Sequence, residues 1–344
     1  MGRVLSTRLH LLIPGLLGPI TKLDSIESEL SVPLLEKLLA RGRKEPCQGQ
    51  DYLTTLFSLF DYPISKDADL PVGAVNVQAD GKVDEACWMR ADPVHLRPDR
   101  DRLLLFHHDQ LEIAPEEVEE LSILFNAHFK EEPFRLVTPE PEHWYLQLDQ
   151  CPDLRTHDLN QVVGHHIEPF MPRGGDARRW RQWLNEMQML LFQSPVNQRR
   201  EAAGLLTING IWMSGVGRLP KLGQSLFARV FGDERTVHGL ARLSGIDFEP
   251  APDEGESLWG QEGDSLMVMS DLIPTILHAD PFHWCEVIQG VDQRMTPVVS
   301  ELQRNKQAEL LIYPCNGRVY RLTTNSLRRF WRRPKKLTEY FVEA

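Results

Sequence analysis

The residues best suited to bind an anion lie in the motif ADPVHLR and just after it: Asp92, His95 and Arg97, followed by Arg100 and Arg102. An arginine guanidinium matches the geometry of a phosphate or a carboxylate, so this group could form an anion-binding pocket. Aspartates and arginines also alternate along this stretch, which fits a salt-bridged hairpin that binds no ligand. The sequence leaves both interpretations open.

A second candidate for phosphate binding is a short polar helix that follows Ser194-Pro195. Asn197 and Arg200 lie near its N-terminus, where free backbone N–H groups and the helix dipole favour an anion. The same two side chains could instead cap the helix and pair with Glu201. The spacing predicts the helix but does not choose between these roles.

Metal binding has one candidate pair. Asp280 and His283 are three residues apart at the start of an expected helix, so both side chains could face one ion.

A basic segment near the end of the chain reads RRFWRRPKK, and its candidate partner-binding residues are Arg328, Arg329, Trp331, Arg332 and Arg333. Basic residues interleaved with aromatic ones could bind a nucleic-acid backbone or an acidic partner. The alternative is an amphipathic terminal element whose aromatic rings insert into the protein and whose arginines serve an acidic face of the same chain.

Composition sets limits on these hypotheses. The chain has 344 residues with a formal net charge of −11, which argues against nucleic-acid binding by the surface as a whole. Five cysteines are scattered without metal-site spacing, which predicts reduced thiols and a cytoplasmic protein rather than a disulfide framework. The apolar run at residues 11–17 is too short to cross a bilayer, so we expect no membrane span. No small-residue cleavage site follows it, so we do not expect a signal peptide.

The elements around these residues alternate between helix and strand. Trp180, Leu184, Met187 and Leu191 recur at three- and four-residue spacing and predict one buried helical face. The apolar run at residues 205–212 predicts a buried strand that Gly215 and Gly217 close with a tight loop. Residues 88–150 read as β-β-α-β-β, which is typical of a small α+β domain.

The stretch SPVNQRREAAGLLTINGIWMSGVGRLP, residues 194–220, resembles the segment HPVN..R...G..P.N.IW.WG.G..P of archaeal-type cofactor-independent phosphoglycerate mutases. It is more similar still to a related bacterial family, the RpfE-type regulatory proteins. The resemblance implies the α/β fold of the alkaline phosphatase superfamily. We expect an alkaline-phosphatase-like core at residues 1–84 and 171–344, with an inserted α+β domain at residues 85–170.

The sequence departs from the mutase pattern where that family binds metal. Pro14-Gly15 stands where the first strand of the mutases ends in an aspartate, and Cys315-Asn316 stands in place of an Asp-His pair. Asp51 falls at the position of the nucleophilic serine. Two-metal chemistry needs ligands for both ions, so these departures predict a catalytically degenerate protein without a metal cofactor.

Three functional hypotheses follow. The first is a regulatory or scaffolding protein that has lost catalysis. The second is an active phosphoglycerate mutase or phosphohydrolase that binds Mn²⁺ or Zn²⁺ near Asp280 and His283. The third is a nucleic-acid-associated accessory protein that uses the basic segment; the family resemblance suggests a RecJ-type exonuclease as its partner.

Overall fold

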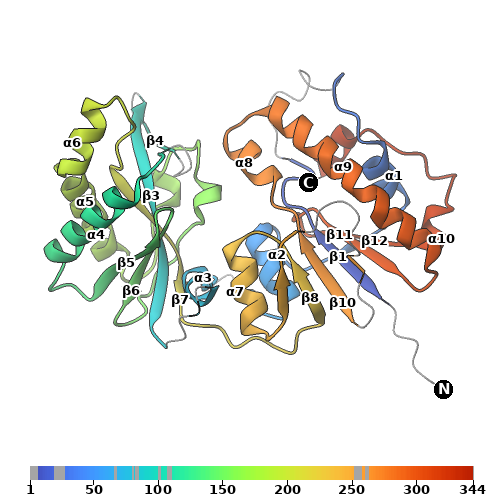
Figure 1. Cartoon of the computed structure of the whole chain (residues 1–344), viewed down its shortest axis with the longest axis horizontal. Coiled ribbons are helices and arrows are strands. Elements are labelled where there is room, and N and C mark those ends of the chain that lie inside the picture. The colour runs from blue at the N-terminus through green and yellow to red at the C-terminus, as the bar shows by residue number, and fades with distance from the viewer. Residues whose placement is uncertain are drawn as a thin grey trace. The chain divides into compact units, whose positions relative to one another are not determined.

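The computed structural model describes residues 7–18, 28–65, 68–79, 81, 85–99, 102–106, 111–251, 258–259 and 263–343. The chain divides into two compact units (Figure 1). One, which we call the core unit, joins Met1–Ile64 to Leu222–Ala344. The other, the inserted unit, is Ser65–Lys221.

The core unit contains strands and helices in alternation. Its strands are β1 (Arg8–Leu12), β2 (Arg43–Pro46), β8 (Phe227–Phe231), β9 (Asp247–Glu249), β10 (Asp264–Val268), β11 (Glu309–Tyr313) and β12 (Arg318–Thr323). Its helices are α1 (Pro33–Arg41), α2 (Tyr52–Leu59), α7 (Arg235–Leu243), α8 (Leu272–Leu277), α9 (Pro281–Arg304) and α10 (Thr324–Leu327), with a 3-10 helix at Leu337–Glu343.

These strands form one sheet in the order β2-β12-β11-β1-β10-β8-β9. The five strands from β11 to β9 are parallel. At one edge, β12 pairs antiparallel with β11, and β2 pairs antiparallel with β12. Strand β1 reads RLHLL and pairs on both sides, with β10 and with β11. A strand that is buried on both faces is mostly apolar, and this explains Leu9, Leu11 and Leu12.

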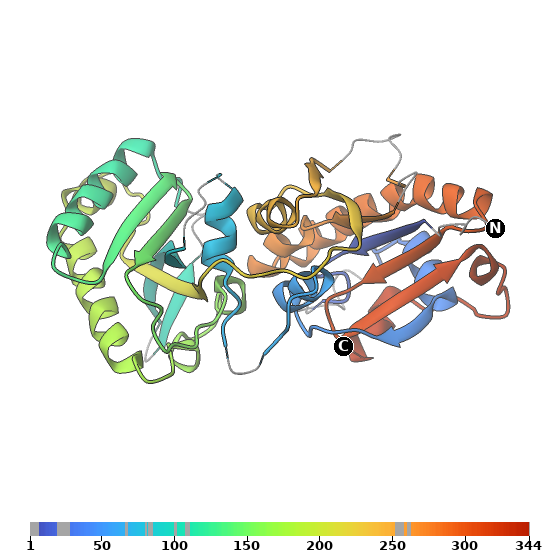
Figure 2. The same cartoon turned by 90° about the horizontal axis from the view of Figure 1, so that it is seen from below.

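Helices α1 and α9 cover one face of this sheet (Figure 2). Leu9 and Leu11 of β1 pack there with Leu35 and Leu38 of α1 and with residues of α9. Helix α9 supplies a long apolar stripe to the same cluster: Trp284, Ile288, Val291, Met295, Val298 and Leu302.

The inserted unit is built on a second, antiparallel sheet. Its strands are β3 (Cys87–Asp99), β4 (Arg102–Phe106), β5 (Phe134–Glu140), β6 (His143–Leu148) and β7 (Gly210–Gly217). Its helices are α3 (Val72–Ala79), α4 (Pro115–His128), α5 (Ala177–Phe192) and α6 (Pro195–Ala202), with 3-10 turns at Leu159–Gln161 and Glu168–Phe170. The long strand β3 pairs with β4, β6 and β7, and β5 pairs with β6.

The two faces of this sheet differ in their cover. Helices α4 and α5 pack on one face, where Phe125, Trp183 and Met187 join a large apolar cluster. Helix α3 packs on the other face through Ala74 and Val77, which contact Trp88 and Tyr145. The approach of α3 to β3 needs Gly73, because a Cβ there would lie 2.6 Å from the Cα of Met89.

The structure differs from the sequence-based expectation at the boundaries of the inserted unit. The unit runs from Ser65 to Lys221, whereas the sequence suggested residues 85–170. Strand β7 explains the second boundary, because it pairs with β3 and so belongs to this sheet together with α5.

The expected strand at residues 205–212 is also displaced. Leu205 and Leu206 are exposed, and the strand begins at Gly210. Gly215 and Gly217 lie inside β7 rather than in a loop after it. The apolar run misled the prediction because hydrophobicity alone does not fix where pairing starts.

The prediction of reduced thiols throughout was wrong, because Cys87 and Cys151 form a disulfide. These residues are 64 positions apart in sequence, but β3 pairs with β6, which places Cys87 opposite Leu148 and near Cys151. Cys47, Cys285 and Cys315 are free thiols.

Within the described part of the chain, no helix has the length and apolar character needed to cross a membrane.

Candidate functional site

A concentration of buried charge lies in the inserted unit, around Arg90 of β3. Its Nη2 donates to Asp92 Oδ1 at 2.7 Å, and its Nη1 donates to Asp158 Oδ2 at 3.3 Å. Arg90 and Asp92 share one face of β3 because side chains alternate along a strand, and this is the face that α3 covers. Asp158 comes from the turn that precedes the first 3-10 helix.

The charges of this cluster bind one another. Burial lowers the pKa of the Arg90 guanidinium, but Asp92 and Asp158 raise it by more, so the pKa lies above its usual value and the side chain stays charged. The side chains of Arg90 and Asp92 are only 18% and 4% exposed. One guanidinium between two carboxylates leaves no excess positive charge to attract an anion.

Strand β7 completes the cluster from the other side. Ser214 and Trp212 lie opposite Arg90 and Asp92 in the β3–β7 pairing. Among the described residues, Asp92 Oδ2 and Ser214 Oγ are buried without a hydrogen-bond partner. These two oxygens could accept hydrogen bonds from a small polar group or from water.

The loop that carries Asp158 is held in place by its own contacts. Thr156 N donates to Asp69 Oδ1 at 3.0 Å, and Gly215 N donates to Thr156 Oγ1 at 3.0 Å. Burial raises the pKa of Asp69, and its hydrogen bonds from Thr156 only partly offset that rise. Trp212 Nε1 donates to the carbonyl oxygen of His157 at 2.9 Å and closes the same loop against β7.

The residues proposed for an anion pocket do not gather in one place. Asp92 binds Arg90, whereas His95 Nδ1 donates to the carbonyl oxygen of Thr207 at 2.8 Å. Arg97 lies over the ring of Phe106, with its guanidinium carbon 4.5 Å from the ring centroid. Asp92 and the pair His95 and Arg97 lie on opposite faces of β3 by strand alternation. Arg100 and the side chain of Arg102 fall outside the described residues.

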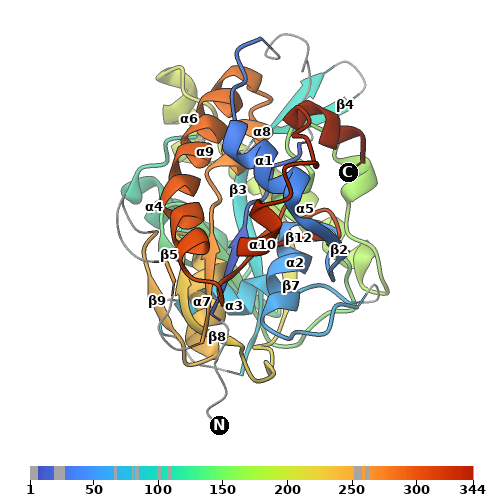
Figure 3. The same ribbon diagram turned by 90° about the vertical axis from the view of Figure 1, so that its right-hand side faces the viewer.

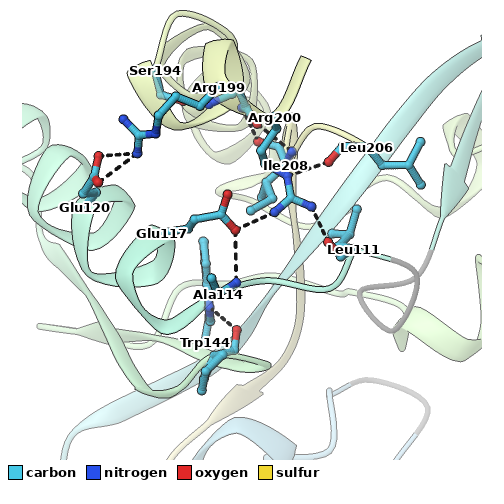
Figure 4. A network of polar contacts seen from close by, with 12 residues as sticks. Leu111, Ala114, Glu117, Glu120, Trp144, Ser194, Arg199, Arg200, Leu206 and Ile208 are labelled. Atoms are coloured by element: carbon cyan, nitrogen blue, oxygen red, sulfur yellow. Dashed lines mark hydrogen bonds and ion pairs between the residues drawn. The ribbon is translucent and has the colours of Figure 1, made fainter. Parts of the chain in front are cut away.

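Asn197 and Arg200 are buried, and both side chains bind groups of the protein itself; Figure 4 shows the contacts of Arg200. Asn197 donates to the carbonyl oxygens of Leu191 and Ile208 and accepts from the N–H of Ile208, each at 2.8 Å. Arg200 Nη1 donates to Glu117 Oε2 at 2.5 Å, Nε donates to Leu206 O at 2.7 Å, and Nη2 donates to Leu111 O. These contacts tie α6 to α4 and to the following loop.

Asp280 and His283 lie at the start of α9 in the core unit. Asp280 is the N-cap, and its Oδ1 accepts from the N–H groups of Phe282 and His283 at 3.1 and 3.0 Å. Within the described residues, no three His, Cys, Asp or Glu side chains are grouped so that they could hold a metal ion. The pair therefore does not make a ligand set by itself.

The carboxyl ends of the parallel strands meet at one edge of the core sheet, where folds of this type bind ligands. Strand β1 ends before Pro14-Gly15, β10 before Met269-Ser270, and β11 before Pro314-Cys315. Burial raises the pKa of the Cys315 thiol well above its usual value, and Asp51 and Cys47 raise it further. A protonated thiol is neither a good nucleophile nor a good metal ligand.

Asp51 has a clear structural use at this edge. It is the N-cap of α2, and its Oδ1 accepts from Thr54 N at 2.8 Å. Asp51 N donates back to Thr54 Oγ1 at 3.2 Å, which completes a capping box.

Sequence reasoning missed Arg90 and Asp158 as members of the buried cluster. The signal for Arg90 was its position two residues before Asp92, which puts both on one strand face. Asp158 has no comparable signal, because only the folded loop brings it to β3.

The fold class is now defined: the chain has the α/β, alkaline-phosphatase-like fold predicted from the sequence. Over 92% of this chain and 86% of the other, it is similar in fold to the PH0037 protein from Pyrococcus horikoshii, with a TM-score of 0.50 and 16% sequence identity. A cofactor-independent phosphoglycerate mutase from Thermoplasma acidophilum aligns over 97% of this chain and 94% of its own, with a TM-score of 0.48 and 16% identity.

The sequence comparisons point to particular relatives. Over 101 residues the chain is 32% identical to a 2,3-bisphosphoglycerate-independent phosphoglycerate mutase of Methanothrix thermoacetophila, covering 29% of this chain and 24% of the relative. The same enzyme of Methanosarcina mazei is 26% identical over 95 residues, or 26% of this chain and 23% of its own length. The chain thus matches about a quarter of the length of these curated relatives. No protein-family model matches the chain.

Proposed function

We propose that this chain is a phosphoglycerate-mutase-like protein that has lost two-metal phosphoryl transfer and acts as a regulatory or scaffolding protein. The observation that carries the proposal is the set of residues at the carboxyl edge of the core sheet. Pro14-Gly15 and Cys315-Asn316 follow the two central strands there. None of these side chains is the carboxylate or histidine that a pair of hard divalent cations requires.

The nucleophile position supports the same proposal. Asp51 stands where the sequence resemblance places the serine, and its carboxylate is engaged in capping α2. A phosphoryl acceptor needs to be exposed and activated by a base or a metal ion. The Asp51 carboxylate instead stabilises α2 as its N-cap.

The polar cluster in the inserted unit also fits a non-catalytic role. Arg90 is neutralised by two carboxylates. Arg200 and Asn197 donate hydrogen bonds to carbonyl oxygens of the protein. A phosphorylated acid would have to displace these internal partners. We therefore propose that the protein works without a metal cofactor and through a protein partner, for which a RecJ-type exonuclease is the candidate that the family resemblance suggests.

The competing proposal is an active mutase or phosphohydrolase that binds Mn²⁺ or Zn²⁺ near Asp280 and His283. Calorimetry of the metal-stripped protein with each ion, together with an assay for interconversion of the two phosphoglycerates, separates the proposals. We expect no saturable binding at micromolar protein and no interconversion.

The matched control is Asp280→Asn, because an amide oxygen can still cap α9 but is a poorer ligand for a divalent cation. Tight binding by the natural chain that this variant abolishes, together with measurable turnover, would overturn the degenerate assignment.

A further inference from the structure

The basic segment, residues 328–336, is fastened to the core unit at both of its ends. Leu327 and Leu337 flank it, and both side chains are buried in the main apolar cluster. At the first end, Thr323 caps the short helix α10. At the second end, Leu337 N donates to Glu36 Oε1 of α1 at 3.0 Å. The residues in between are thus displayed by a closed loop rather than by a free tail.

The middle of the segment is tied to the end of α1. Arg332 Nη1 donates to the carbonyl oxygen of Gly42 at 2.9 Å, and Arg41 Nη1 donates to that of Leu327. Helices α1, α9 and α10 lie side by side in this part of the core unit (Figure 3). The contacts bring the cations of residues 41–44 next to those of the basic segment, and we call the two together the basic surface.

Two aromatic rings project from this surface. Phe330 is 79% exposed and Trp331 is 67% exposed, with ring centroids 5.3 Å apart in an edge-to-face arrangement. The structure thus does not show the insertion of these rings into the protein that the sequence left open as an alternative. Burying one such ring normally contributes strongly to stability, so the exposure of two neighbours marks an interaction surface.

Four arginines of the basic segment have no carboxylate partner among the described residues. Six of the nine residues 328–336 are Arg or Lys, on a chain whose net charge is −11. Among the residues that the structure describes, no ion pair is seen from Arg328, Arg329, Arg332 or Arg333 to a carboxylate. Arg43, in the neighbouring β2, pairs with Glu45 at 3.1 Å and remains 74% exposed.

We propose that the basic surface binds single-stranded nucleic acid. Arginines that lack carboxylate partners can contact successive phosphates, and unpaired bases can stack on Phe330 and Trp331. A single strand matches both features of the surface, because it offers phosphates to the arginines and base faces to the two rings. A duplex would hide its base faces from both rings. The proposal goes beyond the non-catalytic role and does not depend on it, because the surface lies on the end of α1, the start of β2 and a loop rather than at the carboxyl edge of the sheet.

Fluorescence anisotropy of the whole protein with a labelled oligothymidylate of about 20 nucleotides tests this proposal. We expect binding whose affinity falls steeply between 50 and 200 mM salt, as phosphate contacts require. The Phe330→Ala/Trp331→Ala variant should bind at least about tenfold more weakly, since each stacked base contributes substantially to affinity. The Arg328→Glu/Arg333→Glu variant should weaken binding and reduce the salt dependence.

Matched controls keep the test specific. Phe192→Ala/Phe282→Ala removes two other exposed aromatic rings, and Arg178→Glu/Arg304→Glu makes the same change of charge at exposed sites on α5 and α9. Both should bind like the natural chain. The proposal is overturned if the natural chain does not bind at micromolar concentration in 50 mM salt, if the controls lose as much affinity, or if polyglutamate or duplex DNA competes better than the single strand.

Discussion

At the scale of single residues, Arg90 illustrates how a buried charge becomes tolerable. Two carboxylates and the surrounding strands replace the water that the guanidinium loses on folding. Removing one member of such a group leaves the others buried and uncompensated, which costs more than the group contributes as a whole.

The variant Arg90→Met keeps much of the apolar length of the side chain and removes its charge. We expect it to lower the free energy of unfolding by about 3–5 kcal/mol, because Asp92 and Asp158 then face each other unpaired. Urea unfolding followed by circular dichroism measures this change. Asp92→Asn should cost less, because Arg90 keeps Asp158. A loss below about 1 kcal/mol for Arg90→Met would contradict the assigned role.

Only part of this site was accessible from the sequence. The sequence singled out Asp92 as part of an anion pocket or of a salt-bridged hairpin, because charged residues at regular strand spacing are visible without a structure. The partners were not predicted, because they come from separate segments: Asp158 from a loop and Ser214 from β7. Arg200 and Asn197 were expected to bind a ligand or to cap their own helix, and the structure shows them joined to carbonyl oxygens of neighbouring segments.

At the scale of elements, helix α1 depends on a residue of another helix. Its own N-cap, Val32, makes no side-chain hydrogen bond, but Asp292 of α9 accepts from Leu35 N at 2.6 Å. Burial raises the pKa of Asp292, and backbone hydrogen bonds from Leu35 and Leu34 offset only part of this rise. The carboxylate thus links two helices at the cost of being partly desolvated.

The raised pKa of Asp292 makes its contribution to the stability of the protein depend on pH. The folded pKa lies above the unfolded value of about 3.9, so the contribution of Asp292 to stability is complete below that pH and is lost as the pH rises through the folded pKa. Asp292→Asn keeps the acceptor and removes the titration. Its stability relative to the natural chain should increase between pH 4 and pH 7.

Chemical unfolding at a series of pH values checks this expectation, with Asp292→Ala as the control. The alanine variant should be about 1 kcal/mol less stable than the asparagine variant at every pH, because it loses the acceptor for Leu35 N. A difference between the natural chain and Asp292→Asn that did not change with pH would count against the shift.

Strong periodic elements were the most predictable from sequence. The spacing of Trp180, Met187 and Leu191 predicted the buried face of α5, and all three are buried. Strand ends were less predictable, as the displaced start of β7 shows, because pairing with β3 and not hydrophobicity decides where a strand begins. The disulfide escaped prediction for the same reason, since only the β3–β6 pairing brings its cysteines together.

At the scale of the whole molecule, the two units differ in covalent support. The Cys87–Cys151 disulfide lies within the inserted unit. The three free cysteines, Cys47, Cys285 and Cys315, lie in the core unit, and the last two are buried. Reduction should therefore lower the stability of the inserted unit by about 2–4 kcal/mol, because it releases a closed loop in the unfolded chain.

Hydrogen exchange of residues 85–151, with and without dithiothreitol, measures that effect. Protection should fall in the natural chain and should not respond to dithiothreitol in Cys87→Ala/Cys151→Ala. Thiol titration of the denatured, unreduced protein should find three thiols and not five. Five would show that the bond does not form in the isolated protein.

The central position of β1 has a consequence for synthesis on the ribosome. This strand is made long before its two neighbours in the sheet, residues 265–268 and 309–313, which follow it by roughly 250 and 300 residues. At about 5–20 residues per second, the leucines of β1 wait for tens of seconds without either partner. The inserted unit is contiguous and can fold during that interval. The nascent core thus exposes an apolar segment that cellular chaperones would need to shield until β10 and β11 emerge.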